Sequence, residues 1–551
     1  MEFKGFGALP TYRQIEWYKR EKSAFFHFGI NTFTSREWGE GTDSPELFNP
    51  QKLDCRQWVK AIKEAGFTTA IITAKHHDGF CLWPSKYTNY SVKSSPYKNG
   101  EGDIVKEFTD ACREYGIKAG IYLSPWDRHE KSYGTDSYND FYVNQLTELF
   151  TNYGKIYECW WDGAGSTESD YDWARWACTV RNLQPDCVIF GSLGATEFVE
   201  SRWIGNESGS AAKSCWATIN PSSLEKEIAK ELNTGCFGGT RFIPAEADTS
   251  VRPGWFYHEE QNNMVKTPAE LLKYWFNSVG SNAGMLLNIP PSKDGLLMEN
   301  DIQSIIEANR MEKMTFANNL ICGAKVTSDT EVEGYCADKI IFDDDNLFYA
   351  SMKESCQIDI KLQKSITFDC FSISEKIEYG HRVTDFNIEV CENGEWKTVF
   401  NGGCIGYKKA AYFDKVTADE IRVIINGAAN PLISHFGLYK LPEGCFELER
   451  KIREKVDIAK GASAVINTSE TEIEVEFGGI FPFNTVVFNG GGVWDYEVQA
   501  FNGTQYETVY VGSKPAPDQI VKLDDITGSY KMRIVATIGK FIEPSISVYQ
   551  M

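Results

Sequence analysis

The sequence lacks long hydrophobic segments and is poor in positive charge. No run of about 18 apolar residues occurs in the 551 residues, so no segment is predicted to span a membrane. The 56 Lys and Arg residues face 77 Asp and Glu residues, which gives a formal net charge of −21. A nucleic acid partner requires a positive surface, so this charge disfavours nucleic acid and fits a neutral substrate better.

The 15 cysteines are scattered, without the CxxC pairs typical of a zinc site. Scattered thiols in a chain of this size indicate small core residues of a protein in a reducing compartment. The N-terminal sequence MEFKGFGALPTYRQIEWY has no apolar signal segment. As it stands, the sequence predicts a cytoplasmic protein, whereas a longer precursor with a leader would make it extracellular or periplasmic.

The first 315 residues alternate short apolar runs with amphipathic stretches. The runs at 23–30, 68–74 and 117–123 are rich in β-branched and aromatic residues, while 55–66 and 103–116 show helical periodicity and end in Gly. This repeated alternation predicts an α/β fold with a (β/α)8-type barrel rather than a doubly wound sheet. No GxGxxG or Walker motif follows a predicted strand, which argues against nucleotide binding.

After about residue 315 the apolar residues alternate with period two, and turn signals such as ENGE separate the segments. This pattern is typical of β-sandwiches. We therefore predict three domains: a catalytic barrel at 1–317, a β-sandwich at 318–446 and a second β-sandwich-like domain at 447–551.

Chemistry in a parallel barrel is expected at the carboxyl ends of its strands. Asp162 ends the fourth apolar run, follows two Trp residues and precedes Gly163. Glu207 follows later, in RWIGNESG. By position alone Asp162 is equally well explained as a turn or cap residue, and Glu207 as an exposed loop residue. Two carboxyls from different barrel loops are, however, what glycoside cleavage requires.

Three histidines end the first two predicted strands, His27 after the first and His76 with His77 after the second. Adjacent residues of an extended chain point to opposite faces, so His76 and His77 share a ligand only if the chain bends there. A catalytic metal is the least favoured role and a core or loop role is an alternative. We favour hydrogen bonding to substrate hydroxyls, because a neutral imidazole offers both a donor and an acceptor.

Seven sequence blocks stand out, in order along the first 300 residues. They are HFGINTFTSREWGEG (27–41), ITAKHHDGFCLWPSKYTNYS (72–91), GIYLSPWDRH (120–129), WWDGAG (160–165), RWIGNESG (202–209), RPGWFYHEEQ (252–261) and GMLLNIPPSKDGLL (284–297). Together they resemble glycoside hydrolase family 29, the α-L-fucosidases. The resemblance implies a retaining mechanism without a metal or an organic cofactor.

The same resemblance assigns roles to individual residues. Asp162 matches the nucleophile, and Glu207 resembles the acid/base of the branch that carries a GNE block. The remaining expected substrate contacts are His27, His76 and His77 to sugar hydroxyls, Glu37 and Trp38 from a loop over the pocket, and Trp255, Trp161 and Asp127. Other carboxyls that could replace Glu207 are Glu197, Glu200 and Glu246.

The SREWGEG, SPWDRH and RPGWFYH forms are similar to the branch selective for α-1,3 and α-1,4 linkages on branched glycans. The expected partners are fucosylated oligosaccharides or glycoconjugates, with no nucleic acid or membrane partner. Residues 318–441 resemble a discoidin-like module that binds sugar or braces the barrel. Three rival functions stay open: an exo-glycosidase for another sugar, a catalytically silent carbohydrate-binding barrel and a metal-dependent hydrolase.

Overall fold

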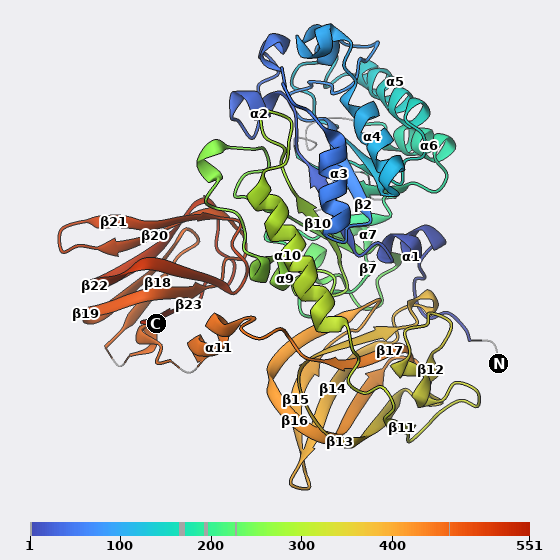
Figure 1. Ribbon diagram of the computed structural model, residues 1–551, viewed down its shortest axis with the longest axis vertical. Helices are drawn as coiled ribbons and strands as arrows, with labels where there is room; N and C mark the ends of the chain where they lie inside the picture. The colour runs from blue at the N-terminus through green and yellow to red at the C-terminus, as the bar shows by residue number, and fades with distance from the viewer. Residues whose placement is uncertain are drawn as a thin grey trace. The chain divides into compact units, whose positions relative to one another are not determined.

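The computed structural model describes residues 3–164, 171–191, 195, 197–225, 229–453, 455–461 and 463–551. Within these ranges the chain forms two compact units. The first comprises Met1–Gly205 and Ala211–Pro442, and the second comprises Asn206–Ser210 and Glu443–Met551. Figure 1 shows the elements of both units.

Eight parallel strands of the described chain close into a barrel in the order β1-β10-β9-β6-β5-β4-β3-β2. The strands β1, β2 and β3 coincide with apolar runs of the sequence, and the predicted (β/α)8-type barrel is confirmed. The strands are β1 (Lys22–Phe26), β2 (Thr69–Lys75), β3 (Lys118–Leu123), β4 (Glu158–Trp160), β5 (Val188–Gly191), β6 (Ser201–Trp203), β9 (Ala245–Ser250) and β10 (Gly284–Asn288).

Helices follow most of these strands and lie outside them, as α3, α4, α9 and α10 do in Figure 1. The side chains of Asp54 and Asp103 cap α3 and α4 at their N-termini, and Gly116 ends α4 in the left-handed conformation. The helices are α1 (Tyr12–Tyr18), α2 (Ile30–Thr34), α3 (Cys55–Glu64), α4 (Ile104–Tyr115), α5 (Asp136–Asn152), α6 (Trp173–Leu183), α7 (Pro221–Glu225), α8 (Ala229–Thr234), α9 (Pro268–Asn277) and α10 (Glu299–Phe316).

Large side chains fill the inside of the barrel. Trp160 and Phe190 stack with ring centroids 4.0 Å apart, and they belong to a buried cluster with residues of β1, β2, β3 and β10. Because strand residues alternate between faces, the residue two positions after an inward residue also faces inward, one level higher. The inward residues Phe25, Tyr122 and Trp160 therefore place His27, Ser124 and Asp162 above this plug.

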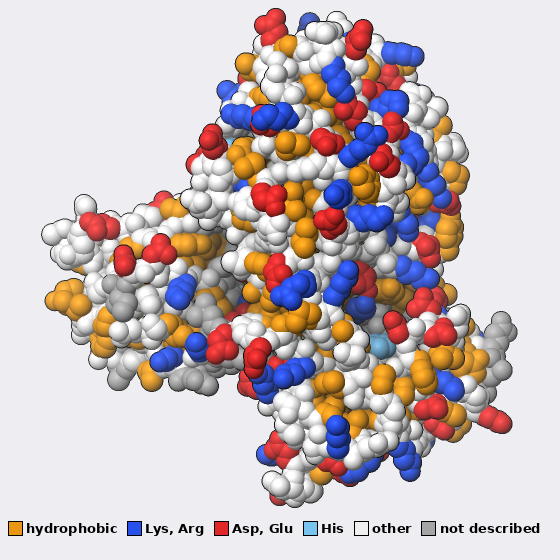
Figure 2. All heavy atoms as spheres, in the orientation of Figure 1, with side chains coloured by type: hydrophobic (Ala, Val, Ile, Leu, Met, Phe, Trp, Pro, Cys, Tyr) orange, Lys and Arg blue, Asp and Glu red, His pale blue; other side chains and the backbone are white. Residues whose placement is uncertain are grey.

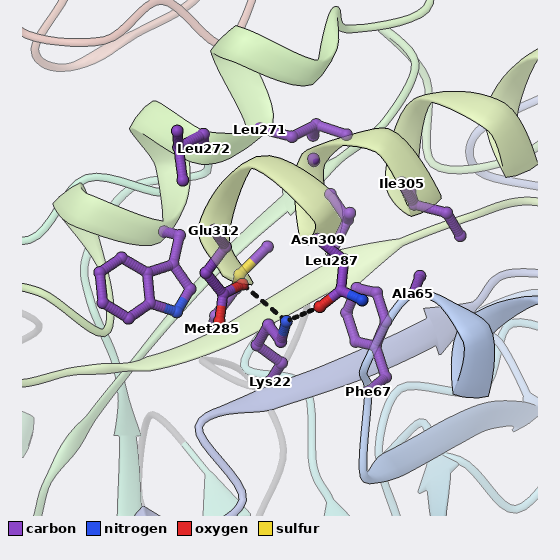
Figure 3. Close-up of a pocket in the computed structure, with 12 residues that line it drawn as sticks. Lys22, Ala65, Phe67, Leu271, Leu272, Met285, Leu287, Ile305, Asn309 and Glu312 are labelled. Atoms are coloured by element: carbon purple, nitrogen blue, oxygen red, sulfur yellow. Dashed lines mark hydrogen bonds and ion pairs between the residues drawn. The ribbon is translucent and has the colours of Figure 1, made fainter. Parts of the chain in front are cut away.

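The start of β1 is tied to a helix on the outside of the barrel. The ammonium of Lys22 donates to Asn309 Oδ1 at 3.0 Å and pairs with Glu312 Oε2 at 2.7 Å, both on α10. Figure 3 shows Lys22 pointing at these two residues, with the apolar side chains of Leu287 and Phe67 close by. The cavity here is about 20 Å³, enough for one water molecule. These contacts hold α10 against the barrel, and the candidate site lies at the carboxyl ends of the strands.

A seven-stranded antiparallel sheet follows α10 in the first unit. It is joined to the barrel by hydrogen bonds from Ala410 N to Gly280 O at 2.9 Å and from Tyr407 N to Asn282 Oδ1 at 2.7 Å. Its strands are β11 (Lys325–Ser328), β12 (Tyr349–Ala350), β13 (Ser355–Glu375), β14 (Val383–Glu392), β15 (Glu395–Gly402), β16 (Lys409–Gly427) and β17 (Leu432–Tyr439). Register shifts between Lys361 and Ile366 interrupt the long pairing of β13 with β16.

The second unit has its own antiparallel sheet of six strands and its own apolar core, which includes Val475, Phe488 and Ile534. It begins at Glu443, a few residues before the predicted limit at 446. Its elements are α11 (Glu447–Arg453), β18 (Val465–Thr468), β19 (Glu472–Phe488), β20 (Val493–Phe501), β21 (Tyr506–Ser513), β22 (Gln519–Gly539) and β23 (Ile546–Tyr549).

The surface reflects the composition. Acidic and basic side chains are interspersed over the face shown in Figure 2, with apolar side chains scattered between them. Among the helices in the described part of the chain, none is both long and apolar enough to cross a bilayer.

Candidate active site

Asp162 lies directly after β4, with one oxygen in a turn and the other facing the histidines. Asp162 Oδ1 accepts from the backbone N–H of Ala164 at 2.9 Å, while Oδ2 accepts from the hydroxyl of Tyr122 at 3.0 Å. Its side chain is 27% exposed. Burial raises the pKa of Asp162, and the hydrogen bonds from Ala164, Tyr122 and the Gly163 backbone oppose that rise. The carboxylate is thus held in one orientation and remains accessible.

His77 presents an unprotonated nitrogen to Asp162. The hydroxyl of Ser124 must donate to Trp126 O at 2.7 Å, because a carbonyl only accepts. Ser124 Oγ therefore accepts at 2.7 Å from Nδ1–H of His77, and Nε2 keeps its lone pair 3.7 Å from Asp162 Oδ2. Burial, then the positive charges nearby, lowers the pKa of His77 to about 3. His77 is neutral, so Nε2 is a hydrogen-bond acceptor rather than one half of an ion pair.

His27 is fixed in the same tautomer by Asn288, at the end of β10. The Asn288 amide nitrogen donates to Trp255 O at 2.8 Å and to Ser250 Oγ at 2.9 Å, which orients the amide group. Asn288 Oδ1 then accepts from the backbone N–H of His27 at 3.1 Å and from Nδ1 at 2.9 Å. The proton of His27 is therefore on Nδ1, and Nε2 is an acceptor.

His76 lies between the other two imidazoles. Its ring is 5.6 Å from that of His27 and 4.1 Å from that of His77, and it lies nearly parallel to Tyr122. Burial lowers its pKa well below the ordinary histidine value, and His77 adds to the effect. Within the described ranges its buried Nδ1 has no hydrogen-bond partner. An unsatisfied buried polar atom costs about 1–3 kcal/mol, so this nitrogen is available to a ligand hydroxyl.

The three histidines do not form a metal site with acidic or thiol ligands. In the parts of the chain that the structure describes, no group of three or more His, Cys, Asp or Glu side chains is arranged to hold a metal ion. The chemistry that this arrangement supports is a carboxylate beside neutral hydrogen-bonding imidazoles.

Two loops meet through Glu37. Its carboxylate accepts from the backbone N–H of Trp255 at 2.9 Å and contacts His258 Nε2 at 2.6 Å. The hydrogen bond to Glu37 raises the pKa of His258, which favours the charged form of that imidazole. The Trp255 ring lies 5.0 Å from the His27 ring. Glu37 therefore fixes the loop that places Trp255 against the histidines.

Trp38 and Trp126 form an aromatic corner beside His77. Trp38 is 54% exposed and stands edge-on to the rings of His77 at 5.9 Å and Trp126 at 5.6 Å. The Trp126 ring is 5.0 Å from that of His77. Trp126 was not among the predicted substrate contacts, although it directly precedes Asp127 in the SPWDRH segment, which was predicted to lie at the site.

Two expected substrate contacts, Trp161 and Asp127, are engaged by other protein groups. Trp161 is fully buried and packs against Trp173 and Trp176 of α6, because it alternates with the inward residues Trp160 and Asp162. The packing gives Trp161 a role in the core between β4 and α6.

The carboxylate of Asp127 is likewise occupied by protein groups. Its Oδ2 pairs with the buried Lys75 ammonium at 2.8 Å, and its Oδ1 accepts from the backbone N–H groups of His129 and Glu130. Asp127 shapes the loop that carries Trp126 and is not turned toward a substrate.

The alternative acid/base carboxyls have protein partners or lie at the surface. Glu246 is buried and accepts from Trp160 Nε1 at 2.8 Å, while Glu200 pairs with Arg13 and with Arg181. Glu197 is exposed. Glu207 lies in the Asn206–Ser210 segment of the second unit.

The site also contains residues that sequence reasoning did not select: Tyr122, Ser124, Asn288 and His258. Tyr122 and Ser124 carry a detectable signal, since both fall on the inward-facing positions of one strand. The hydrogen bond between Ser124 and His77, by contrast, depends on how the loops after two different strands bend, which the sequence does not show.

Comparison with known proteins identifies the family. The family model described as Alpha-L-fucosidase matches residues 3–310. The chain belongs to glycoside hydrolase family 29, the α-L-fucosidases. Alpha-L-fucosidase 1 of Arabidopsis thaliana is 40% identical over 450 residues, which cover 78% of this chain and 87% of the plant protein.

Solved structures agree. A putative α-L-fucosidase from Bacteroides thetaiotaomicron is 44% identical with a TM-score of 0.79, covering 80% of this chain and 100% of that one. A Ruminococcus gnavus family 29 fucosidase in complex with fucose is 35% identical with a TM-score of 0.75, covering 80% and 97% of the two chains. This chain is thus an α-L-fucosidase, a glycoside hydrolase.

Proposed function

We propose that this α-L-fucosidase removes terminal α-1,3- and α-1,4-linked fucose from branched glycans by double displacement, with Asp162 as nucleophile and Glu207 as acid/base. Asp162 attacks the anomeric carbon as the glycosidic bond breaks, and Glu207 gives its proton to the leaving oxygen. Water then attacks the fucosyl ester, Glu207 takes the proton of that water, and Asp162 is released. Retention of this kind requires carboxyls roughly 5–5.5 Å apart.

The observation that carries the proposal is the environment of Asp162. Its carboxylate is held by two hydrogen-bond donors above the barrel plug, and a neutral imidazole rather than a cation faces its Oδ2. A nucleophile needs an ionised, oriented oxygen that no cation neutralises. A turn residue alone would not need the hydroxyl of Tyr122 on its second oxygen.

The histidines support a sugar substrate. His27 and His77 each present an accepting Nε2, so the ligand must supply hydroxyl donors at two places. Fucose has hydroxyls on its ring and an apolar methyl group, which matches imidazole acceptors next to aromatic faces such as that of Phe256, 5.0 Å from His76. A sugar without one of these hydroxyls would leave a buried polar atom unpaired and be rejected strongly.

The linkage preference rests on the loops around the mouth. The SREWGEG, SPWDRH and RPGWFYH blocks that resemble the α-1,3/1,4-selective branch carry Trp38, Trp126 and Trp255. Glu37 joins the first of these loops to the third, so they form one connected rim. A rim of this kind restricts which aglycone fits beside the fucose.

The test is product analysis with site variants. Purified protein is given α-1,2-, α-1,3- and α-1,4-fucosylated oligosaccharides, and the anomer of the first released fucose is recorded by NMR. We expect α-fucose from the α-1,3 and α-1,4 substrates. Release of β-fucose would refute double displacement, and a preference for the α-1,2 substrate would refute the linkage assignment.

Variants separate the two carboxyls. Asp162→Ala should abolish turnover while the thermal unfolding midpoint stays near that of the parent. Glu207→Ala should lose activity on natural glycans and recover part of it on an activated aryl fucoside when azide is added. Glu197→Ala, which removes an exposed carboxyl, is the matched control and should be fully active. Near-normal turnover by Asp162→Ala would show that another residue is the nucleophile.

A further inference from the structure

Glu207 has a charged partner within its own compact unit. The Asn206–Ser210 segment groups with residues 443–551, and there Glu207 Oε2 lies 3.4 Å from Nζ of Lys514. The Lys514 side chain is only 7% exposed and that of Glu207 is 16% exposed. Exposed ion pairs contribute little to stability. The attraction between two opposite charges is stronger when water is largely excluded from them, as it is here.

The backbone holds Lys514 in an uncommon conformation. Lys514 follows β21 with φ of +49°, the left-handed region, and its N–H donates to Trp494 O at 2.6 Å. Pro515 comes next and packs tightly on Gly490. A Cβ added at position 490 would lie 2.4 Å from the Cβ of Pro515. A left-handed non-glycine residue is strained and persists only where its surroundings enforce it. The backbone of Lys514 is therefore held in place at the end of β21, beside the start of β20.

We propose that Lys514 is a positioning residue for the acid/base: its ammonium holds the Glu207 side chain in place and stabilises the carboxylate that proton donation leaves behind. The inference rests on the proposed role of Glu207. Lys514 itself neither gains nor loses a proton. In the first step the proton of Glu207 moves to the leaving oxygen, and in the second Glu207 receives a proton from the attacking water, so its charged form is needed in between.

Lys514 and Glu207 belong to the same compact unit. The seven-stranded sheet of the first unit is bonded to the barrel and braces it, whereas the six-stranded sheet carries Lys514 at a strand end. Removing the ammonium would leave a poorly hydrated carboxylate without its partner, which disfavours the form that Glu207 reaches when its proton has left.

The test uses leaving groups of graded acidity with the full chain. Lys514→Met keeps the length of the side chain and removes the charge, Lys514→Arg keeps the charge, and Lys522→Met is the control, an exposed lysine of the same unit. General acid catalysis contributes about 10²–10⁴-fold, and it matters most when the leaving group is poor. We expect Lys514→Met to lose on the order of tenfold or more in kcat/KM on a phenyl or oligosaccharide fucoside and little on a dinitrophenyl fucoside. Lys514→Arg should keep most of the activity and Lys522→Met all of it.

The outcomes separate this inference from the acid/base assignment. Glu207→Ala is assayed beside the lysine variants, with and without azide. If Glu207→Ala shows azide rescue while Lys514→Met equals the parent on both kinds of substrate, the role of Lys514 is refuted and that of Glu207 stands. An equal loss on both substrates in Lys514→Met, or no recovery in Lys514→Arg, also refutes positioning. If Glu207→Ala keeps full activity on the poor leaving group, the acid/base assignment itself fails.

Discussion

Replacing Tyr122 with Phe tests how the charge of Asp162 is maintained. The substitution removes one hydroxyl, 3.0 Å from Asp162 Oδ2, and keeps the ring that fills the barrel. A hydrogen bond to a charged group contributes about 1.5–3 kcal/mol. Its loss should raise the pKa of Asp162 and weaken the ionised form by about ten- to a hundredfold, since 1.36 kcal/mol corresponds to a factor of ten. The direction follows because the lost donor stabilised only the ionised form, and burial already raises this pKa.

The assay is the pH dependence of kcat/KM, whose acidic limb reports the free-enzyme carboxylate that must be ionised. In Tyr122→Phe that limb should move to higher pH, which makes activity roughly ten- to a hundredfold lower on the acidic side. Tyr142→Phe is the control, since Tyr142 is equally buried but donates to Leu123 O at 2.6 Å. An unchanged acidic limb in Tyr122→Phe would mean that this hydroxyl does not support the nucleophile.

Two further predictions concern the supports of the site. Lys75→Met leaves the buried Asp127 carboxylate unpaired, so we expect a loss of about 3–5 kcal/mol in the free energy of unfolding, measured with urea; an unchanged midpoint would contradict this. Glu37 raises the folded-state pKa of His258. The Glu37–His258 contact therefore stabilises this loop fully below about pH 6.5, the ordinary pKa of histidine, and this stabilisation is lost as pH rises through the raised pKa of His258. Hydrogen exchange at the Trp255 amide, corrected for intrinsic rate, should therefore lose protection over that range in the parent, whereas Glu37→Gln should show no such pH dependence.

The barrel was predictable because its signals are local. Apolar runs of five to seven residues with helical stretches between them mark β1, β2 and β3, and Gly116 marks a helix end. The carboxyl-end rule then selected His27, His76, His77 and Asp162, which the structure brings to one mouth. Strand alternation was the neglected signal, since the inward position of Trp160 already sends Trp161 outward to α6.

The supports of the site could not be predicted, because they depend on contacts between distant parts of the chain. Asn288 orients His27 across 261 positions, and Glu37 holds the loop of Trp255 across 218. Neither periodicity nor composition carries information on such pairs. The pairing of Asp127 is hidden for a similar reason: its ammonium partner, Lys75, is an inconspicuous residue at the end of another strand.

Burial acts in opposite directions on the two groups that meet at the barrel mouth. It raises the pKa of Asp162 and lowers that of His77, so in both cases it favours the neutral form. Neutrality suits His77, because a cationic imidazole 3.7 Å away would bind the nucleophile as an ion pair. It does not suit Asp162, and the donors Tyr122 and Ala164 counteract it there. The hydroxyl of Ser124 completes the arrangement. It accepts a hydrogen bond from Nδ1–H of His77, which leaves the lone pair of His77 Nε2 facing the pocket. The low dielectric of the site thus keeps the imidazole uncharged, while a few directed hydrogen bonds oppose the rise that burial causes in the pKa of the carboxylate.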